Sequence, residues 1–188
     1  MSMNELHKYG ISSYYELDKL DESQIVSVIK NYCPYAIKYL TNPSYRVQEV
    51  SITQNAGYLR FIKNPSDKII RLALKQDIQS AIYIKKPSAD MQIFAVSLDP
   101  IAVKYLGPTC KRAQILAVSN KPDMYTNIKN PELETSILAV TYDKHMLPYV
   151  PIEHQQDDAF RLMLKLEHDF DVDEPIDLDE YLEDDIPF

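Results

Sequence analysis

The strongest constraint on this chain is an internal repeat with a period of 22 residues. An apolar triplet with a small residue at its centre recurs at this interval, in Val50-Ser51-Ile52, Leu72-Ala73-Leu74, Phe94-Ala95-Val96, Leu116-Ala117-Val118 and Leu138-Ala139-Val140. A copy of this length is too small to bury its own apolar face, so successive copies must stack to complete a core. We expect the small central residues to lie where neighbouring helices approach most closely.

Two further sets of residues follow the same period. One is aromatic and the other aliphatic: Tyr39, Phe61, Tyr83 and Tyr105, and beside them Leu40, Ile62, Ile84, Leu106 and Ile128. The aromatic rings either fill one core layer in each copy or form a ladder on which nucleic-acid bases stack. We favour the core interpretation because an aliphatic residue directly follows each ring.

The stretch "NPSDKIIRLALKQ" indicates what each copy builds. Its apolar residues follow helical spacing rather than strict alternation. We expect Asn64 to cap this helix, Pro65 to take its first position and Asp67 to lie in the first turn, where negative charge is favourable. The preceding stretch "AGYLRFIK" predicts a shorter helix, and turns near "TQN" and "KQD" join successive copies.

The sequence therefore predicts an all-α fold, an α-solenoid of about six two-helix repeats of 22 residues followed by a disordered acidic tail. The expected organisation is an N-terminal cap at residues 1–19, a repeat domain at 20–166 and a flexible tail at 167–188. The recurring pattern exemplified by "AIKYLTNPS" resembles short α-helical repeats of unknown function in viral and protist proteins, over about residues 20–165. This resemblance implies a helical array and no particular chemistry.

Composition and charge exclude several classes of protein. No apolar run of about 18 residues occurs, and the first residues lack the order of a secretory signal, so we expect a cytoplasmic protein without membrane association. Residues 167–188 contain eleven acidic and no basic residues, whereas residues 1–166 contain 17 acidic and 20 basic residues. The chain is thus a mildly basic body joined to an acidic tail.

No pattern of residues indicates catalysis or a cofactor. Cys33 and Cys110 fit a reducing compartment and are expected to be small, partly buried apolar residues. The four histidines are scattered and lack metal-binding spacing. Two acidic pairs are expected at helix starts instead of in an active site: Glu132 with Glu134, and Asp157 with Asp158. We therefore expect no enzyme, no metal, no cofactor and no small-molecule substrate.

The acidic segment closes with a short apolar motif. From Asp169 it reads "DFDVDEPIDLDEYLEDDIPF", in which single apolar residues alternate with acids. Self-repulsion and poor burial predict disorder, and a merely solubilising tail is one interpretation. The motif also resembles the terminal peptide of bacterial single-stranded DNA-binding proteins. The matching residues are Asp184, Asp185, Ile186, Pro187 and Phe188, and Glu183 extends the acidic approach.

That resemblance implies a set of partners. In the single-stranded DNA-binding proteins, replication, recombination and repair enzymes bind this peptide. An aromatic ring suits a small apolar pocket, a carboxylate suits an arginine clamp, and the acids suit a basic rim. The bodies of those proteins are all-β OB-folds, unlike the helical repeats expected here. We therefore expect a non-enzymatic interaction protein that mimics the tail to recruit or inhibit such enzymes, and a bacteriophage origin fits this hypothesis.

An alternative function is the binding of single-stranded nucleic acid by the body. Three lysines recur at multiples of the period, and further basic residues lie near them; the candidates are Lys63, Lys85, Lys104, Lys111, Arg112 and Lys129. Such a ladder can follow a phosphate backbone, with the acidic tail competing for the same surface. A solvated helix face explains the same residues, and we favour it because Asp90, Glu132 and Glu134 interrupt the basic stripe.

Overall fold

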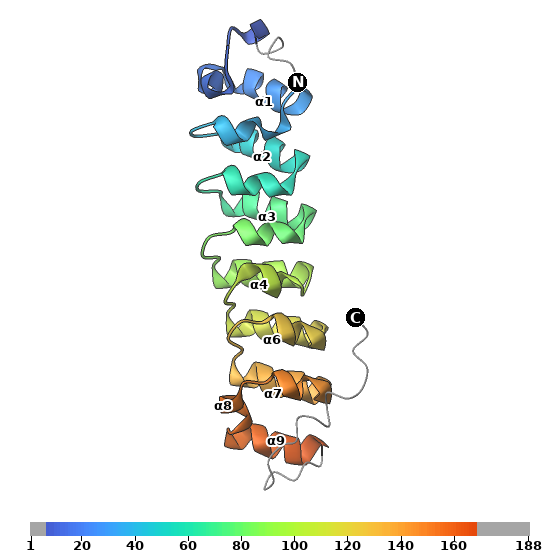
Figure 1. Ribbon diagram of the computed structural model, residues 1–188. Helices are drawn as coiled ribbons and strands as arrows, with labels where there is room; N and C mark the ends of the chain where they lie inside the picture. Colours follow the sequence, from blue (N-terminus) through green and yellow to red (C-terminus); the bar gives the residue numbers. More distant parts are fainter. Residues whose placement is uncertain (1–6, 169–188) are drawn as a thin grey trace. The chain divides into compact units, whose positions relative to one another are not determined.

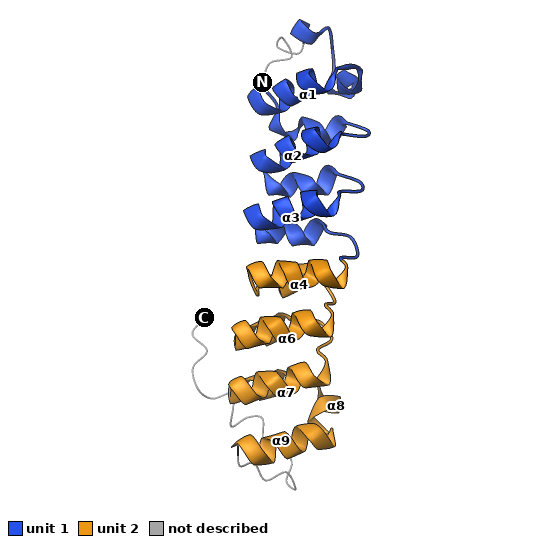
Figure 2. Cartoon of the chain, turned by 180° about the vertical axis from the view of Figure 1, so that it is seen from behind, with its two compact units in different colours: residues 1–87 blue, residues 88–188 orange. Residues whose placement is uncertain are grey.

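The computed structural model describes residues 7–168, which form a succession of short helices (Figure 1). No strand occurs among these residues, so the predicted all-α class is confirmed. The chain divides into two compact units, unit 1 at residues 1–87 and unit 2 at residues 88–188 (Figure 2). This boundary lies inside the range 20–166 expected to be one repeat domain; the predicted limits of cap and tail stay predictions.

Unit 1 alternates 3-10 helices (η) with α-helices. In chain order they are η2 (Tyr14–Lys19), α1 (Glu22–Asn31), η3 (Pro34–Tyr39), α2 (Tyr45–Gln54), η4 (Ala56–Phe61), α3 (Asp67–Gln76) and η5 (Ile78–Tyr83). Helix α2 packs against α1 on one side and against α3 on the other, and η3, η4 and η5 also contact one another in sequence. Each element therefore contacts its counterpart in the next copy.

Unit 2 repeats this arrangement with one irregular short helix. Its elements are α4 (Ala89–Leu98), α5 (Ala102–Leu106), α6 (Lys111–Asn120), η6 (Pro122–Asn127), α7 (Leu133–Tyr142), η7 (Lys144–Tyr149), α8 (Ile152–Gln155) and α9 (Asp158–His168). Helix α6 packs between α4 and α7, and α7 also contacts α9. The α5 helix replaces a 3-10 helix where Gly107 takes a positive φ of 77° and Pro108 is displaced by one residue from the repeat.

The helix boundaries follow the predicted period. Helices α2, α3, α4, α6 and α7 each contain 10 residues and begin 22 residues apart, at positions 45, 67, 89, 111 and 133. The short helix expected in "AGYLRFIK" is η4, so that prediction is confirmed, and its hydrogen bonding is of the 3-10 type. The acidic pairs also lie at helix starts, since Glu132 is the N-cap of α7 and Asp158 begins α9.

The prediction that Asn64 caps α3 and Pro65 opens it is wrong, because Ser66 is the N-cap and the helix begins at Asp67. The neighbouring copies give the physical reason. The Ser44 hydroxyl accepts a hydrogen bond from the third amide of α2 at 3.3 Å, and the Ser88 hydroxyl does the same in α4 at 3.2 Å. Serine at this position can reach the free amides of the first turn, although the Ser66 side chain itself makes no capping hydrogen bond in α3. Asp67 lies in the first turn, as predicted.

The short helices begin with a different cap. Side-chain oxygens of Asn55, Asp77 and Asp143 accept hydrogen bonds from the amide two residues ahead, at 2.7, 2.9 and 3.0 Å. Such local bonds turn the backbone sharply at the end of the preceding α-helix. The predicted turns near "TQN" and "KQD" are therefore confirmed, because Asn55 and Asp77 are their last residues.

The core of each copy is built on the small central residues. Ser51, Ala73, Ala95, Ala117 and Ala139 are all fully buried. The aliphatic set is buried in four of five copies, whereas the aromatic rings are only half-buried. The core interpretation thus describes the aliphatic residues well, while part of each ring reaches the surface.

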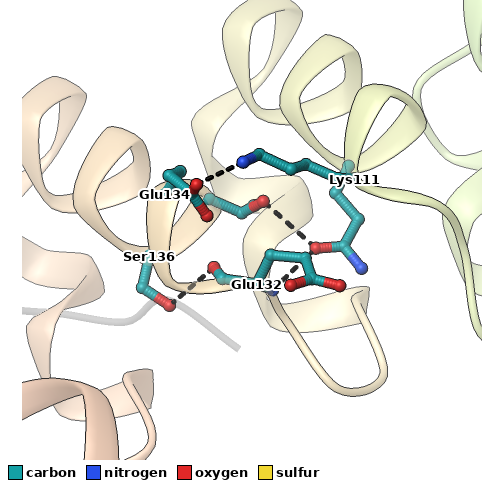
Figure 3. A network of polar contacts seen from close by, with 6 residues as sticks. Lys111, Glu132, Glu134 and Ser136 are labelled. Atoms are coloured by element: carbon teal, nitrogen blue, oxygen red, sulfur yellow. Dashed lines mark hydrogen bonds and ion pairs between the residues drawn. The ribbon is translucent and has the colours of Figure 1, made fainter.

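Buried glutamines join successive copies in unit 2. The Gln92 side-chain oxygen accepts a hydrogen bond from the Cys110 amide at 2.6 Å. One copy later, the Gln114 oxygen accepts from the Glu132 amide at 2.9 Å and from the Thr135 hydroxyl at 3.1 Å, around the cluster shown in Figure 3. The bond from Thr135 is buried and the other two are partly buried, so losing the bond from Thr135 leaves a buried polar group without a partner.

Candidate functional site

The residues of the predicted peptide motif, Glu183 to Phe188, lie outside the described residues. Their assignment to partner binding stays a prediction from the sequence. The site that the structure does describe is built from the second group of predicted residues, the cations of the repeats.

The six predicted cations are all exposed, and they are divided between the two units. Lys63 and Lys85 belong to unit 1 and lie in the same groove. The other four belong to unit 2, where Lys104 lies in α5, Lys111 and Arg112 open α6, and Lys129 follows η6.

Lys111 is paired with a neighbouring carboxylate. Its ammonium group forms an exposed ion pair with Glu134 of the following copy (Figure 3). The hydrogen bond from Lys111 holds the pKa of the Glu134 carboxyl below its usual range. Exposed pairs contribute little to stability, about 0–1 kcal/mol, but this one removes a free positive charge from the surface of unit 2.

The groove of unit 1 lies between two successive turns of the repeat and has a volume of about 340 Å³. It is lined by Leu59, Arg60, Phe61, Ile62, Lys63, Asn64, Pro65, Ile70, Tyr83, Ile84 and Lys85, and is called the cationic groove below. Its apolar wall comes from buried residues such as Leu59, Ile62 and Ile70. The exposed cations Arg60, Lys63 and Lys85 stand at its surface.

The charge in the cationic groove is not balanced locally. None of its lining residues is acidic, and the ion pairs of Lys19, Lys111 and Lys121 lie elsewhere in the chain. The surrounding sequence adds to this field, because residues 45–87 contain eight Lys and Arg against three Asp and Glu. The groove is therefore suited to an anionic ligand.

Arg60 was not among the predicted residues. Its guanidinium carbon lies 4.6 Å from the centre of the Phe61 ring, and Tyr58 packs against the same ring at a centroid distance of 6.1 Å. One copy earlier, the Lys38 ammonium lies 5.6 Å from the Tyr39 ring centre. A cation directly before each aromatic residue was thus the sequence pattern that could have identified Arg60. The pattern is incomplete because the uncharged residue Ile82 takes this position in one copy.

A smaller groove one copy earlier has the opposite charge. Its volume is about 170 Å³, and its lining includes Asp18 and Glu22 but no lysine or arginine. Asp18 accepts hydrogen bonds from the amide and the hydroxyl of Thr41, and Glu22 accepts one from the Ser44 hydroxyl. The positive charge of the cationic groove is therefore particular to its copies and is no general property of the repeat.

A separate cluster with altered titration surrounds Cys33 in unit 1. Burial raises the pKa of the Cys33 thiol, and the same effect, aided by Cys33, raises the pKa of Tyr14 to about 12. Cys33 is 1% exposed. A buried thiol that stays protonated at neutral pH is a poor nucleophile, so the cluster behaves as part of the core.

Within residues 7–168, no group of three or more His, Cys, Asp and Glu side chains gathers closely enough to hold a metal ion. None of the helices in this range is long and apolar enough to cross a membrane. Comparisons with protein-family models, with curated proteins and with solved structures found no match to this chain.

Proposed function

We propose that the chain is a non-enzymatic interaction protein whose helical repeats carry a peptide read by DNA-processing enzymes. The repeats form an α-solenoid of about six two-helix copies, and the predicted acidic tail, residues 167–188, carries the recognition peptide. The partners are enzymes of replication, recombination or repair that bind the tail of single-stranded DNA-binding proteins. The observation that carries the proposal is the order Asp-Asp-Ile-Pro-Phe at residues 184–188, after a segment in which acids alternate with apolar residues and no base occurs.

The chemistry of these residues supports the proposed role. The Phe188 ring offers an apolar group for a small pocket, and Pro187 restricts the backbone, which reduces the entropy lost on docking. Asp184 and Asp185 suit the positively charged rim of such a pocket and accelerate the encounter at low salt. Because few residues would be buried, we expect a dissociation constant of about 1 μM.

The described residues support the scaffold part of the proposal. Helices of equal length begin at equal intervals in both units, and within each unit these helices pack on one another in chain order. Such arrays provide rigid carriers on which a short recognition peptide can be displayed. The last described helix, α9, spans Asp158–His168 and so includes Glu167 and His168, the first two residues of the predicted tail.

The test is binding of the full chain to a bacterial enzyme that binds the tail of single-stranded DNA-binding protein, measured by calorimetry. Phe188→Ala removes the ring that fills the pocket, and we expect it to weaken binding at least about tenfold. Tyr181→Ala is the matched control, because it removes an aromatic ring from the same acidic segment outside the motif. A peptide with the sequence of the bacterial tail should compete with the wild-type chain.

Equal binding by the wild-type chain and Phe188→Ala would contradict the proposal. An equal loss in Tyr181→Ala would also count against it, since the motif would then have no special part. Raising the salt concentration should weaken the wild-type complex, because acids and basic rim attract each other through solvent.

A further inference from the structure

The cationic groove of unit 1 has no part in the proposed function of the acidic segment. Its chemistry combines three elements: the exposed cations Arg60, Lys63 and Lys85, the half-buried rings of Phe61 and Tyr83, and an apolar wall. Cations alone are common on helical surfaces. Their convergence on a hollow that also presents aromatic rings and excludes carboxylates indicates a ligand with both negative charge and flat apolar groups.

We propose that the cationic groove binds single-stranded nucleic acid without sequence preference. The phosphates contact Lys63 and Lys85, which occupy the same position in successive copies. One base stacks in the groove beside Phe61 and Tyr83, which also correspond in successive copies. Alternation of charged groups with aromatic rings is the usual arrangement in proteins that bind single strands, because the cations follow the backbone and the rings receive the bases.

The Arg60 guanidinium strengthens the stacking surface. It lies 4.6 Å from the centre of the Phe61 ring, so the ring and the planar cation form one composite surface. Guanidinium groups and aromatic rings both stack on nucleobases, and the guanidinium adds attraction for phosphate. A groove volume of about 340 Å³ is near the lower limit for ligand sites, about 300–1,000 Å³, which fits a single nucleotide unit.

The distribution of charge along the chain supports an anionic polymer as ligand. Unit 1 has twelve Lys and Arg against eight Asp and Glu, a net charge of +4, whereas unit 2 has eight against twenty, a net charge of −12. The overall charge of −8 therefore conceals a positive unit. Within unit 1 the excess of positive charge is concentrated around the groove, so the groove attracts a polyanion from a distance.

Single strands are favoured over duplexes because the aromatic groups need unstacked bases. The groove is also lined by residues of turns and 3-10 helices, and only Ile70 belongs to an α-helix. No described α-helix is thus presented along the groove for insertion into the major groove of DNA, which is the usual way in which duplex sequence is read.

The experiment uses the full chain and a fluorescent oligothymidylate of about 15 nucleotides, with fluorescence anisotropy at low salt. A double variant, Lys63→Glu with Lys85→Glu, should weaken binding at least about tenfold and flatten the salt dependence. Lys75→Glu is the control for reversing the charge of a single lysine away from the groove, since Lys75 is exposed on α3 but does not line the groove. It should weaken binding less than about threefold.

Two further variants test stacking and competition. Phe61→Leu keeps an apolar side chain but removes the ring, and should weaken binding by about 5- to 150-fold. Circular dichroism confirms that each variant is folded. Replacing Glu180, Glu183 and Asp184 by the corresponding amides removes part of the competing acidic segment and should strengthen oligonucleotide binding.

Three results would overturn the proposal: no binding by either the wild-type chain or the amide variant, equal binding by the double variant and Lys75→Glu, or equal affinity for duplex and single strand. Binding of a synthetic peptide of residues 176–188 in the groove, without oligonucleotide binding, would assign the groove to an acidic peptide. The proposal does not rest on the function of the acidic segment, because none of its groove variants alters residues 184–188.

Discussion

Gln114→Leu tests whether buried amide bonds hold neighbouring copies together. Gln114 is 1% exposed. Its amide nitrogen donates to the carbonyls of Thr109 at 2.9 Å and Asn130 at 3.3 Å, and its oxygen accepts from Glu132 and Thr135. One side chain therefore satisfies backbone groups at two successive turns.

The expected cost follows from the groups left without partners. The bonds to the Thr109 carbonyl and the Thr135 hydroxyl are buried, and each buried group left unsatisfied costs about 1–3 kcal/mol. The other two bonds are partly buried and lose less, because water can replace the partner. Leucine gains some apolar burial, which offsets part of the loss. We expect the free energy of unfolding of the α6–α7 region to fall by roughly 2–4 kcal/mol.

Hydrogen exchange measured by mass spectrometry on peptides from α6 and α7 reports this local stability. Gln48→Leu is the matched control, because Gln48 has the same place in its copy and bonds the Pro43 carbonyl at 2.8 Å in a partly buried position. It should cost no more than about 1 kcal/mol. A loss in Gln114→Leu no larger than in the control would refute the reasoning.

Three other changes have definite expected outcomes. Lys86→Asn should raise the free energy of unfolding by roughly 0.5–1 kcal/mol in urea denaturation, because Lys86 has a positive φ of 51°, which asparagine tolerates better; a loss of stability would contradict this. Lys111→Met should raise the pKa of the Glu134 carboxyl toward its ordinary value of 4.5, followed by NMR titration, because Lys111 lowers it in the folded chain; an unchanged pKa would show that the pair is not formed. Burial raises the pKa of Tyr14 from 10.0 to about 12, so its contribution to stability is complete below pH 10.0 and is lost as the pH rises to about 12. Alkaline denaturation should therefore be less steep in Tyr14→Phe, and identical profiles would disprove the assignment.

Much of the fold could be predicted because the copies repeat in register. The interval between the triplets gave the positions of the long helices, and the interval between the turns gave the short ones. The 3-10 type of the short helices could not be predicted, since six residues fit either helical spacing. The helix start at Ser66 was missed because asparagine and serine both cap well, and only the backbone geometry shows that the helix begins at Asp67.

The site was predicted less completely than the fold. Lys63 and Lys85 were found because they share a repeat position. Arg60 was missed because the equivalent repeat position is lysine in some copies but isoleucine at residue 82. The recurrence of a cation at this position is therefore incomplete. Lys111 was predicted as a candidate cation because it lies in a basic cluster near the recurring lysines, and only the structure shows its carboxylate partner, Glu134.

The constant interval between helix starts has an evolutionary consequence. Ser88 and Cys110 have the same place at the start of consecutive long helices, α4 and α6. Recombination between the corresponding coding segments would join Ser88 directly to Lys111 and delete one complete 22-residue repeat. The caps, turns and buried residues of the remaining repeats would keep their spacing. Homologous genes of this kind should therefore differ in length by whole modules, and truncation within a module should be rare.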